Sequence, residues 1–337
     1  MKRHSKDYSR PEIIPEPAWK ELASSLLHRN ETVLIIGAAN SGKSTLTQYL
    51  LGRFLEINVP VALIDADYDI DTIWEHKRYN KRMIRNTFSM LHGIGKKLER
   101  RLWKNGILTW HDFLGASDVH FINPPKKQTF DNYLFHALKE LSEGNAPYFA
   151  ENLKRTEHWR LFDIFREKAA CLDIETNGLS PESGGYITLI GIYDGFDYKC
   201  FIRDKSLTID NVRRELSRYK YLITFYGSAF DIPFMKRSLP DLTFNVPHFD
   251  ICFGARKLGI RRGLKTLEKD LGIERDKSVR GMNGYDAVRF WEYSKGGSSE
   301  ALDLLITYNR EDTVNLFQIA DIVYQRLRAQ TGIDEYL

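Results

Sequence analysis

The stretch Ala170-Cys171-Leu172-Asp173-Ile174-Glu175-Thr176-Asn177-Gly178-Leu179 decides the fold of the C-terminal half of this chain. Its apolar start predicts a buried strand that ends in an Asp-x-Glu pair and a glycine-containing turn. Because side chains i and i+2 of a strand lie on one face, Asp173 and Glu175 should point the same way, opposite to Leu172 and Ile174. Two neighbouring carboxylates repel each other, and a hard divalent cation such as Mg²⁺ or Mn²⁺ would neutralise them.

Two later segments carry groups that could join this pair. An apolar strand at 221–225 leads through a glycine-containing turn to Asp231, which is expected to begin a helix. Tyr308 and Asp312 stand four residues apart on a helix predicted to run to about residue 328, so they project from one face. Between the strands, residues 187–202 read as a hairpin with an Asp-Gly turn.

In this order, Asp-x-Glu-Thr, an aspartate after Gly-Ser-Ala-Phe, and Tyr-x-x-x-Asp resemble the tyrosine-bearing branch of the DEDD exonuclease superfamily. More closely, residues 86–331 resemble the bacterial YprB-like family of ribonuclease H-like exonucleases. Tyr148-Phe149-Ala150 and residues 158–162 are similar to that family's lead-in to its first strand.

This resemblance implies an α/β fold with a ribonuclease H-like mixed sheet flanked by helices. It also implies a 3′→5′ exonuclease that hydrolyses phosphodiester bonds with two Mg²⁺ or Mn²⁺ ions. Single-stranded DNA is the favoured substrate, and RNA stays open. On the resemblance, Asp173, Glu175, Asp231 and Asp312 are the metal ligands, and Tyr308 positions the attacking water.

Each motif also has a structural explanation. A lone Asp-x-Glu at a strand end is a common surface feature, and Tyr-x-x-x-Asp on a helix is commonly a packing pair. Their order and context favour the catalytic interpretation. For His248 and Asp250, we favour a strand end that caps the next helix over an auxiliary role in the site.

Two basic segments could contact nucleic acid. Arg261, Arg262 and Lys265 lie between catalytic segments, and we expect a phosphate-contact surface there, although a solvated helix face would also explain them. Gly93-Ile94-Gly95-Lys96-Lys97 looks like the turn of a helix–hairpin–helix, in which the exposed backbone amides of Gly93 and Gly95 and the charges of Lys96 and Lys97 would meet phosphate. A purely structural turn is the alternative.

A third motif stands near the N-terminus. Gly37-Ala38-Ala39-Asn40-Ser41-Gly42-Lys43-Ser44 fits the P-loop pattern between a predicted strand and a predicted helix, which indicates ATP binding. The candidate ligands of the nucleotide are Gly37, Asn40, Ser41, Gly42, Lys43, Ser44 and Thr45. Residues 15–70 resemble the start of polynucleotide 5′-hydroxyl kinases, but the Gly-Gln that follows that family's acidic pair is replaced by Tyr68-Asp69-Ile70. We therefore expect an abbreviated P-loop unit, which could support oligomerisation by pairing with another copy.

Length and composition frame these motifs. The 337 residues suffice for two or three domains, which we predict at 1–75, 76–168 (with helices near 130–141 and 150–165) and 169–337. A net charge of +4 permits a polyanionic partner. Three scattered cysteines indicate neither disulfides nor zinc, and no apolar run has the length of a membrane span. We expect a cytoplasmic protein that does not partner with a membrane.

Two rival functions stay open. The chain could be a polynucleotide 5′-kinase fused to a nuclease for end processing, or a non-catalytic nucleic-acid-binding module in which the carboxylates no longer turn over substrate. The sequence does not decide whether the substrate is DNA or RNA, because no residue can be assigned to contact a 2′-hydroxyl.

Overall fold

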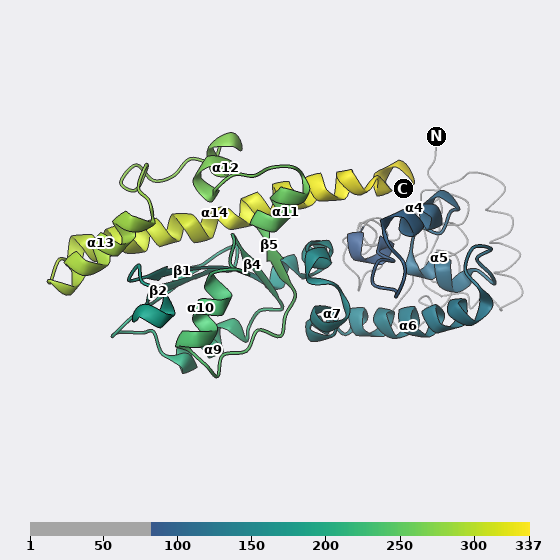
Figure 1. Ribbon diagram of the computed structural model, residues 1–337, viewed down its shortest axis with the longest axis horizontal. Helices are drawn as coiled ribbons and strands as arrows, with labels where there is room; N and C mark the ends of the chain where they lie inside the picture. The colour runs from purple at the N-terminus through teal and green to yellow at the C-terminus, as the bar shows by residue number, and fades with distance from the viewer. Residues whose placement is uncertain (1–81) are drawn as a thin grey trace, which may run out of the picture. The chain divides into compact units, whose positions relative to one another are not determined.

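Residues 82–337 are the part of the chain that the computed structural model describes (Figure 1). They pack as one unit. The predicted P-loop unit at 1–75, with its candidate nucleotide ligands from Gly37 to Thr45, lies outside the described residues. The predictions made for that unit therefore stay predictions.

A five-stranded mixed sheet lies at the centre of the C-terminal half, in the order β3-β2-β1-β4-β5. The strands are β1 (Ala169–Thr176), β2 (Ile187–Tyr193), β3 (Tyr198–Ile202), β4 (Tyr221–Thr224) and β5 (His248–Asp250). The first three strands pair antiparallel, which confirms the hairpin predicted at 187–202, and β4 and β5 extend the sheet in parallel with β1. The mixed sheet expected from the sequence is thus present.

Helices cover both faces of this sheet, and Figure 1 shows α14 running along one face while α9 and α10 lie against the other. The helices of this half are α9 (Ile209–Leu216), α10 (Asp231–Ser238), α11 (Ile251–Lys257), α12 (Leu264–Asp270), α13 (Gly284–Lys295) and α14 (Ser299–Thr331). The hydroxyl of Ser298 accepts from the amide of Ala301 at the start of α14, and Gly332 ends that helix with φ +79°.

The alternation of side chains along β1 divides the core into two layers. Leu172 and Ile174 pack with Val212 and Met235 of α9 and α10. Cys171 packs instead with the cluster that contains Leu316 of α14. Because successive side chains of a strand alternate, the odd-numbered positions that follow Cys171 also face α14.

A helical segment precedes the sheet. Its helices are α4 (Lys96–Lys104), α5 (Trp110–Gly115), α6 (Pro124–Ser142), α7 (Ala146–Asn152) and α8 (Phe162–Phe165), with the 3-10 helices η1 (Met83–Asn86), η2 (Arg155–Leu161) and η3 (Arg166–Lys168). Two further 3-10 helices lie outside this segment: η4 (Pro181–Ser183) between β1 and β2, and η5 (Ile333–Glu335) after α14. The helix predicted near 130–141 lies within α6. Residues 82–337 contain no helix that is both long and apolar enough to cross a membrane.

The single helix predicted over 150–165 is wrong. The chain ends α7 at Asn152, becomes extended at Leu153, and continues as η2 and α8. Buried polar contacts account for the break: the ring of His158 bonds the carbonyl of Leu153 at 3.0 Å, and Arg160 forms an ion pair with Glu99 at 3.0 Å. These tertiary contacts outweigh the local helical preference.

The Gly93–Lys97 turn begins α4. Gly93 has φ +81°, which favours glycine, and Gly95 is the N-cap residue. Gly93, Gly95, Lys96 and Lys97 are all exposed. In the described residues a short 3-10 helix, η1, precedes this turn in place of an α-helix. The helix–hairpin–helix assignment stays a prediction.

Candidate active site

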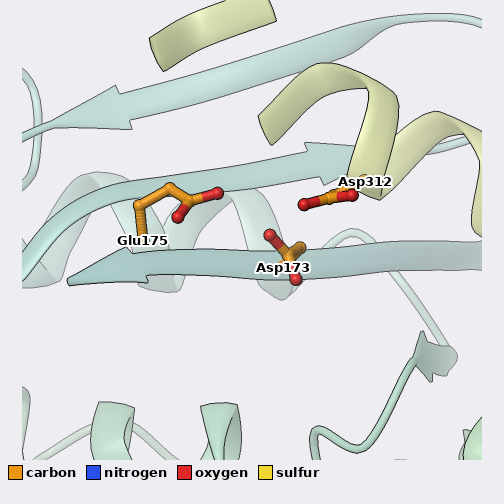
Figure 2. Close-up of side chains that lie close together, drawn as sticks. All are labelled: Asp173, Glu175 and Asp312. Atoms are coloured by element: carbon orange, nitrogen blue, oxygen red, sulfur yellow. The ribbon is translucent and has the colours of Figure 1, made fainter. Parts of the chain in front are cut away.

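Three of the predicted carboxylates converge between the sheet and the long helix. One oxygen each from Asp173 and Glu175 of β1 and from Asp312 of α14 lie within 4.8 Å of one another. Figure 2 shows the carboxylates of Glu175 and Asp312 side by side, with that of Asp173 below and between them. The residues come together because β1 presents its odd-numbered side chains to the face along which α14 packs.

The electrostatics of this cluster fit a hard divalent cation. Burial raises the pKa of the Asp173 carboxyl well above its usual range, and the nearby charges of Asp231, Glu175 and Asp312 raise it further. Burial and the charge of Asp312 raise the pKa of Glu175 in the same way. Carboxylates that repel one another and offer oxygen donors only are the ligand set that Mg²⁺ or Mn²⁺ prefers.

Asp231, the fourth predicted ligand, lies beside this cluster rather than within it. It is the first residue of α10, as the sequence predicts, and its Oδ1 accepts a hydrogen bond from the backbone amide of Ile174 at 3.1 Å. Burial raises the pKa of Asp231 to about 7. Its charge nevertheless acts on Asp173. The structure therefore brings Asp173, Glu175 and Asp312 together. It holds Asp231 next to them through the hydrogen bond from the backbone amide of Ile174.

Asn309 is a site residue that sequence reasoning missed. Its Nδ2 donates to Oδ2 of Asp173 at 2.8 Å and to Oε1 of Glu175 at 3.4 Å. Its Oδ1 accepts from the hydroxyl of Tyr198 at 2.8 Å, which fixes the orientation of the amide. Asn309 precedes Asp312 by three residues, and this helical spacing was the available signal.

Arg275 is a second residue that was missed. It lies in the loop between α12 and α13 and donates to the buried carboxylate of Glu268, from Nε at 2.6 Å and from Nη2 at 2.8 Å. The same Nη2 forms an ion pair with Asp312. A loop arginine carries no periodic signal, so only the fold could place it beside the carboxylates.

Tyr308 and Lys265 meet at the edge of the cluster. The ammonium of Lys265 donates to the Tyr308 hydroxyl at 2.7 Å and to the carbonyl of Met282. Burial and the charge of Asp312 raise the pKa of Tyr308, so its hydroxyl keeps its proton. Burial lowers the pKa of Lys265. Lys265, which the sequence predicts to contact phosphate, thus lies against the predicted water-positioning residue.

A cleft of about 1100 Å³ opens over these groups. Asp173, Tyr308 and Asp312 line it together with four basic side chains, Arg256, Arg261, Arg262 and Lys265. The predicted basic positions just before α12 and in its first turn therefore border the carboxylates. Lys96 and Lys97 are not among the residues that line this cleft.

Asp250 has the capping role that the sequence favoured. Its Oδ1 accepts from the backbone amide of Cys252 at 3.1 Å, at the start of α11. The same carboxylate accepts from the amides of Tyr226 and Ser228, both at 2.9 Å. It therefore shapes the turn after β4 that the cleft borders.

The C-terminal half of the chain is similar in sequence to a known superfamily. Residues 170–324 match a family model described as the RNase_H superfamily. This part of the chain is thus similar to ribonuclease H-like domains. One solved structure, described as the apo form of the nuclease, aligns at 19% identity and a TM-score of 0.35, covering 50% of this chain and 85% of that chain. No curated protein matches the chain.

Proposed function

We propose that this chain is a metal-dependent 3′→5′ exonuclease that hydrolyses phosphodiester bonds, with single-stranded DNA as the favoured substrate. The observation that carries the proposal is the convergence of Asp173, Glu175 and Asp312 at a cleft whose other charged lining residues are all basic. Carboxylates gather the cations that hydrolysis needs, and arginines attract the phosphates of the substrate. The exonucleolytic polarity rests on the resemblance of residues 86–331 to YprB-like exonucleases.

Asp173, Glu175 and Asp312 would hold the metal, with Asp231 as the fourth ligand that the resemblance implies. Two divalent ions bound there would supply an activated water and neutralise charge on the leaving 3′ oxygen. The side-chain amide of Asn309 donates to the carboxylates of Asp173 and Glu175. Hydrogen bonds of this kind hold metal ligands in the orientation that the metal needs.

The remaining groups act directly on water and phosphate. Tyr308 keeps its proton, so its hydroxyl can donate to or orient a water but cannot take a proton from it. Lys265 donates to the Tyr308 oxygen and holds the ring in place. Arg261 and Arg262, exposed at the rim of the cleft, would contact the phosphates of the strand.

Matched DNA and RNA oligomers, labelled in turn at each end, test this proposal in Mg²⁺, Mn²⁺ or EDTA. The full chain should release mononucleotides from the 3′ end of single strands in the presence of metal, and Asp173→Asn should lower the rate at least ~10³-fold, since the variant loses a metal ligand. Asp210→Asn, an exposed aspartate of α9, is the matched control and should retain activity.

Binding of Mn²⁺, followed by calorimetry, provides a readout that is independent of turnover. Asp173→Asn should weaken it and Asp210→Asn should not. The proposal fails if the chain degrades no strand in either metal, or if Asp173→Asn cleaves as fast as the unaltered chain.

We propose nucleotide binding as a second property of the chain, on the P-loop sequence from Gly37 to Thr45. ATP should bind the full chain, and Lys43→Ala should abolish that binding. Transfer of the terminal phosphate to a 5′-hydroxyl, lost in the same variant, would favour the kinase–nuclease alternative. Absence of ATP binding would refute the assignment.

A further inference from the structure

Two exposed aromatic rings stack beside the carboxylate cleft. Tyr226 follows β4 and Phe253 lies on α11, and their ring centroids are 6.0 Å apart with an angle of 26° between the planes. They are 44% and 40% exposed. The guanidinium of Arg256, one turn after Phe253, lies 5.7 Å from the first ring and 5.0 Å from the second. We call these three residues the aromatic platform.

The backbone at Tyr226 has an energetically unfavourable conformation. Tyr226 has φ +66°, a region that bulky side chains rarely adopt. The Asp250 carboxylate fixes the turn through the amides of Tyr226 and Ser228. A β-carbon on Gly227 would overlap Thr224, so the turn packs directly on the end of β4. Such strain persists only where the surroundings impose it, and it is concentrated at binding sites.

The platform separates two hollows. Tyr226 and Arg256 line the cleft that holds Asp173 and Asp312. Phe253 lines a neighbouring cavity of about 350 Å³, which Arg155 also borders. A chain of phosphates that passes from one hollow to the other would therefore meet positive charge on both sides of the rings.

We propose that the aromatic platform binds an unpaired nucleobase of the strand whose end enters the carboxylate cleft. This inference rests on the proposed nuclease function and names the substrate feature that the cleft recognises. Every nucleobase has a flat π face that can stack on tyrosine or phenylalanine, and arginine adds a planar cation to the same surface. A base in a duplex already stacks on its neighbours, so the platform selects single strands.

Charge complementarity argues for a nucleic acid as the occupant. The rings are flanked by Arg256 and, along the same cleft, by Arg261 and Arg262. An apolar partner would gain from the rings but would offer no anion to Arg256 or Arg261. A strand satisfies both, because its bases and phosphates alternate.

Fluorescein-labelled oligomers of deoxyuridine and of uridine, which differ only in the 2′-hydroxyl, are bound to the full chain in Ca²⁺ buffer and test the platform by anisotropy. Tyr226→Ala and Phe253→Ala should each weaken binding about 5- to 100-fold, which corresponds to the loss of one base stack. Tyr226→Phe, which keeps the ring, should bind within about twofold of the unaltered chain. Any difference between the two oligomers separates DNA from RNA.

Tyr293→Ala is the matched control. Tyr293 lies on α13, is 54% exposed and carries Arg289 at 5.8 Å from its ring, yet it is not among the residues that line the carboxylate cleft. This variant should bind like the unaltered chain. Melting temperatures of all variants establish that each is folded, and Phe253→Ala tests the platform without altering the strained turn.

An abasic nucleotide, moved along the oligomer, gives a readout that a structural role would not change. At one position it should weaken binding to the unaltered chain and have little further effect on Tyr226→Ala, since the lost base and the lost ring belong to one contact. Equal weakening in both proteins, or binding of both alanine variants within twofold of the unaltered chain, overturns the platform. If the platform is overturned in this way but the chain still cleaves strands, the proposed nuclease function stands. If binding depends on the platform but no strand is cleaved in any metal, the nuclease function is refuted and the platform stands.

Discussion

Gly191 and Asn309 approach so closely that a β-carbon on Gly191 would overlap the amide oxygen of Asn309. Gly191 pairs with Asp173 across β1 and β2, so the empty space that its missing side chain leaves lies directly beside the first carboxylate. That space admits Asn309 of α14, whose amide then bonds Asp173 and Glu175. A glycine inside a strand therefore sets how near the helix comes to the carboxylates.

Gly191→Ala should push α14 away from β2 at this point. Overpacking of this kind costs about 1–3 kcal/mol in the free energy of unfolding, and displacement of the site should lower the rate of hydrolysis by about 100-fold. Urea unfolding and a nuclease assay measure the two effects. Gly115→Ala is the control, because a β-carbon added at Gly115 has no neighbour within 4 Å. This variant should leave the free energy of unfolding unchanged or raise it slightly. Full activity in Gly191→Ala would contradict the argument.

The raised pKa values of the site predict that the metal-free protein loses stability as pH rises. The pKa of Asp231 is about 7 in the folded chain, and burial raises those of Asp173 and Glu175 as well. The unfolded chain releases these protons near pH 4, so the contribution to stability is complete below that pH and is lost as pH rises towards 7 and above. Thermal unfolding in EDTA from pH 4 to pH 8 should show this decline.

Metal should reverse the decline, because a cation binds the deprotonated carboxylates. The increase in melting temperature on adding Mn²⁺ should therefore be larger at pH 8 than at pH 5.5. Asp231→Asn should make the stability of the metal-free protein less dependent on pH. The asparagine side-chain oxygen can still accept the hydrogen bond from the amide of Ile174, but the side chain does not ionise. A profile that is equally steep in this variant would argue against Asp231 as a source of the effect.

Arg275 should matter for stability as well as for the site. Arg275→Met leaves the buried Glu268 carboxylate without its cation, and removal of one partner of a buried pair costs about 3–5 kcal/mol in the free energy of unfolding. The double variant Arg275→Met, Glu268→Leu removes both charges and should recover most of that loss. Urea unfolding of both proteins distinguishes this account from simple loss of packing, in which the double variant would be the less stable.

Tyr308→Phe and Lys265→Met should lower turnover without removing the metal site. Loss of a positioned hydroxyl or of its ammonium partner should decrease kcat about 10- to 100-fold, while Mn²⁺ binding stays within about twofold of the unaltered chain. Arg262→Met, a basic residue at the rim of the cleft, should instead raise KM. If Tyr308→Phe lost Mn²⁺ binding as well as turnover, Tyr308 would be holding the metal ligands in place rather than positioning the water.

The sequence allowed the strands, their hairpin and the order of the acidic segments to be predicted, because alternating and helical periodicities are local properties. It also placed Asp231 at the start of a helix and Tyr308 and Asp312 on one helical face. The helix predicted over 150–165 was wrong, since the buried contacts of His158 and Arg160 are made with partners that local propensity does not include.

By itself the sequence determined that β1 presents two carboxylates on one face, since a period of two along a strand follows from backbone geometry. Only the tertiary structure decided which groups meet them. Asn309 reaches them through the space at Gly191, Arg275 arrives from a loop, and Tyr226 is exposed by a turn that Asp250 holds. These contacts join residues far apart in the chain, and their free energies depend on packing that no local pattern encodes.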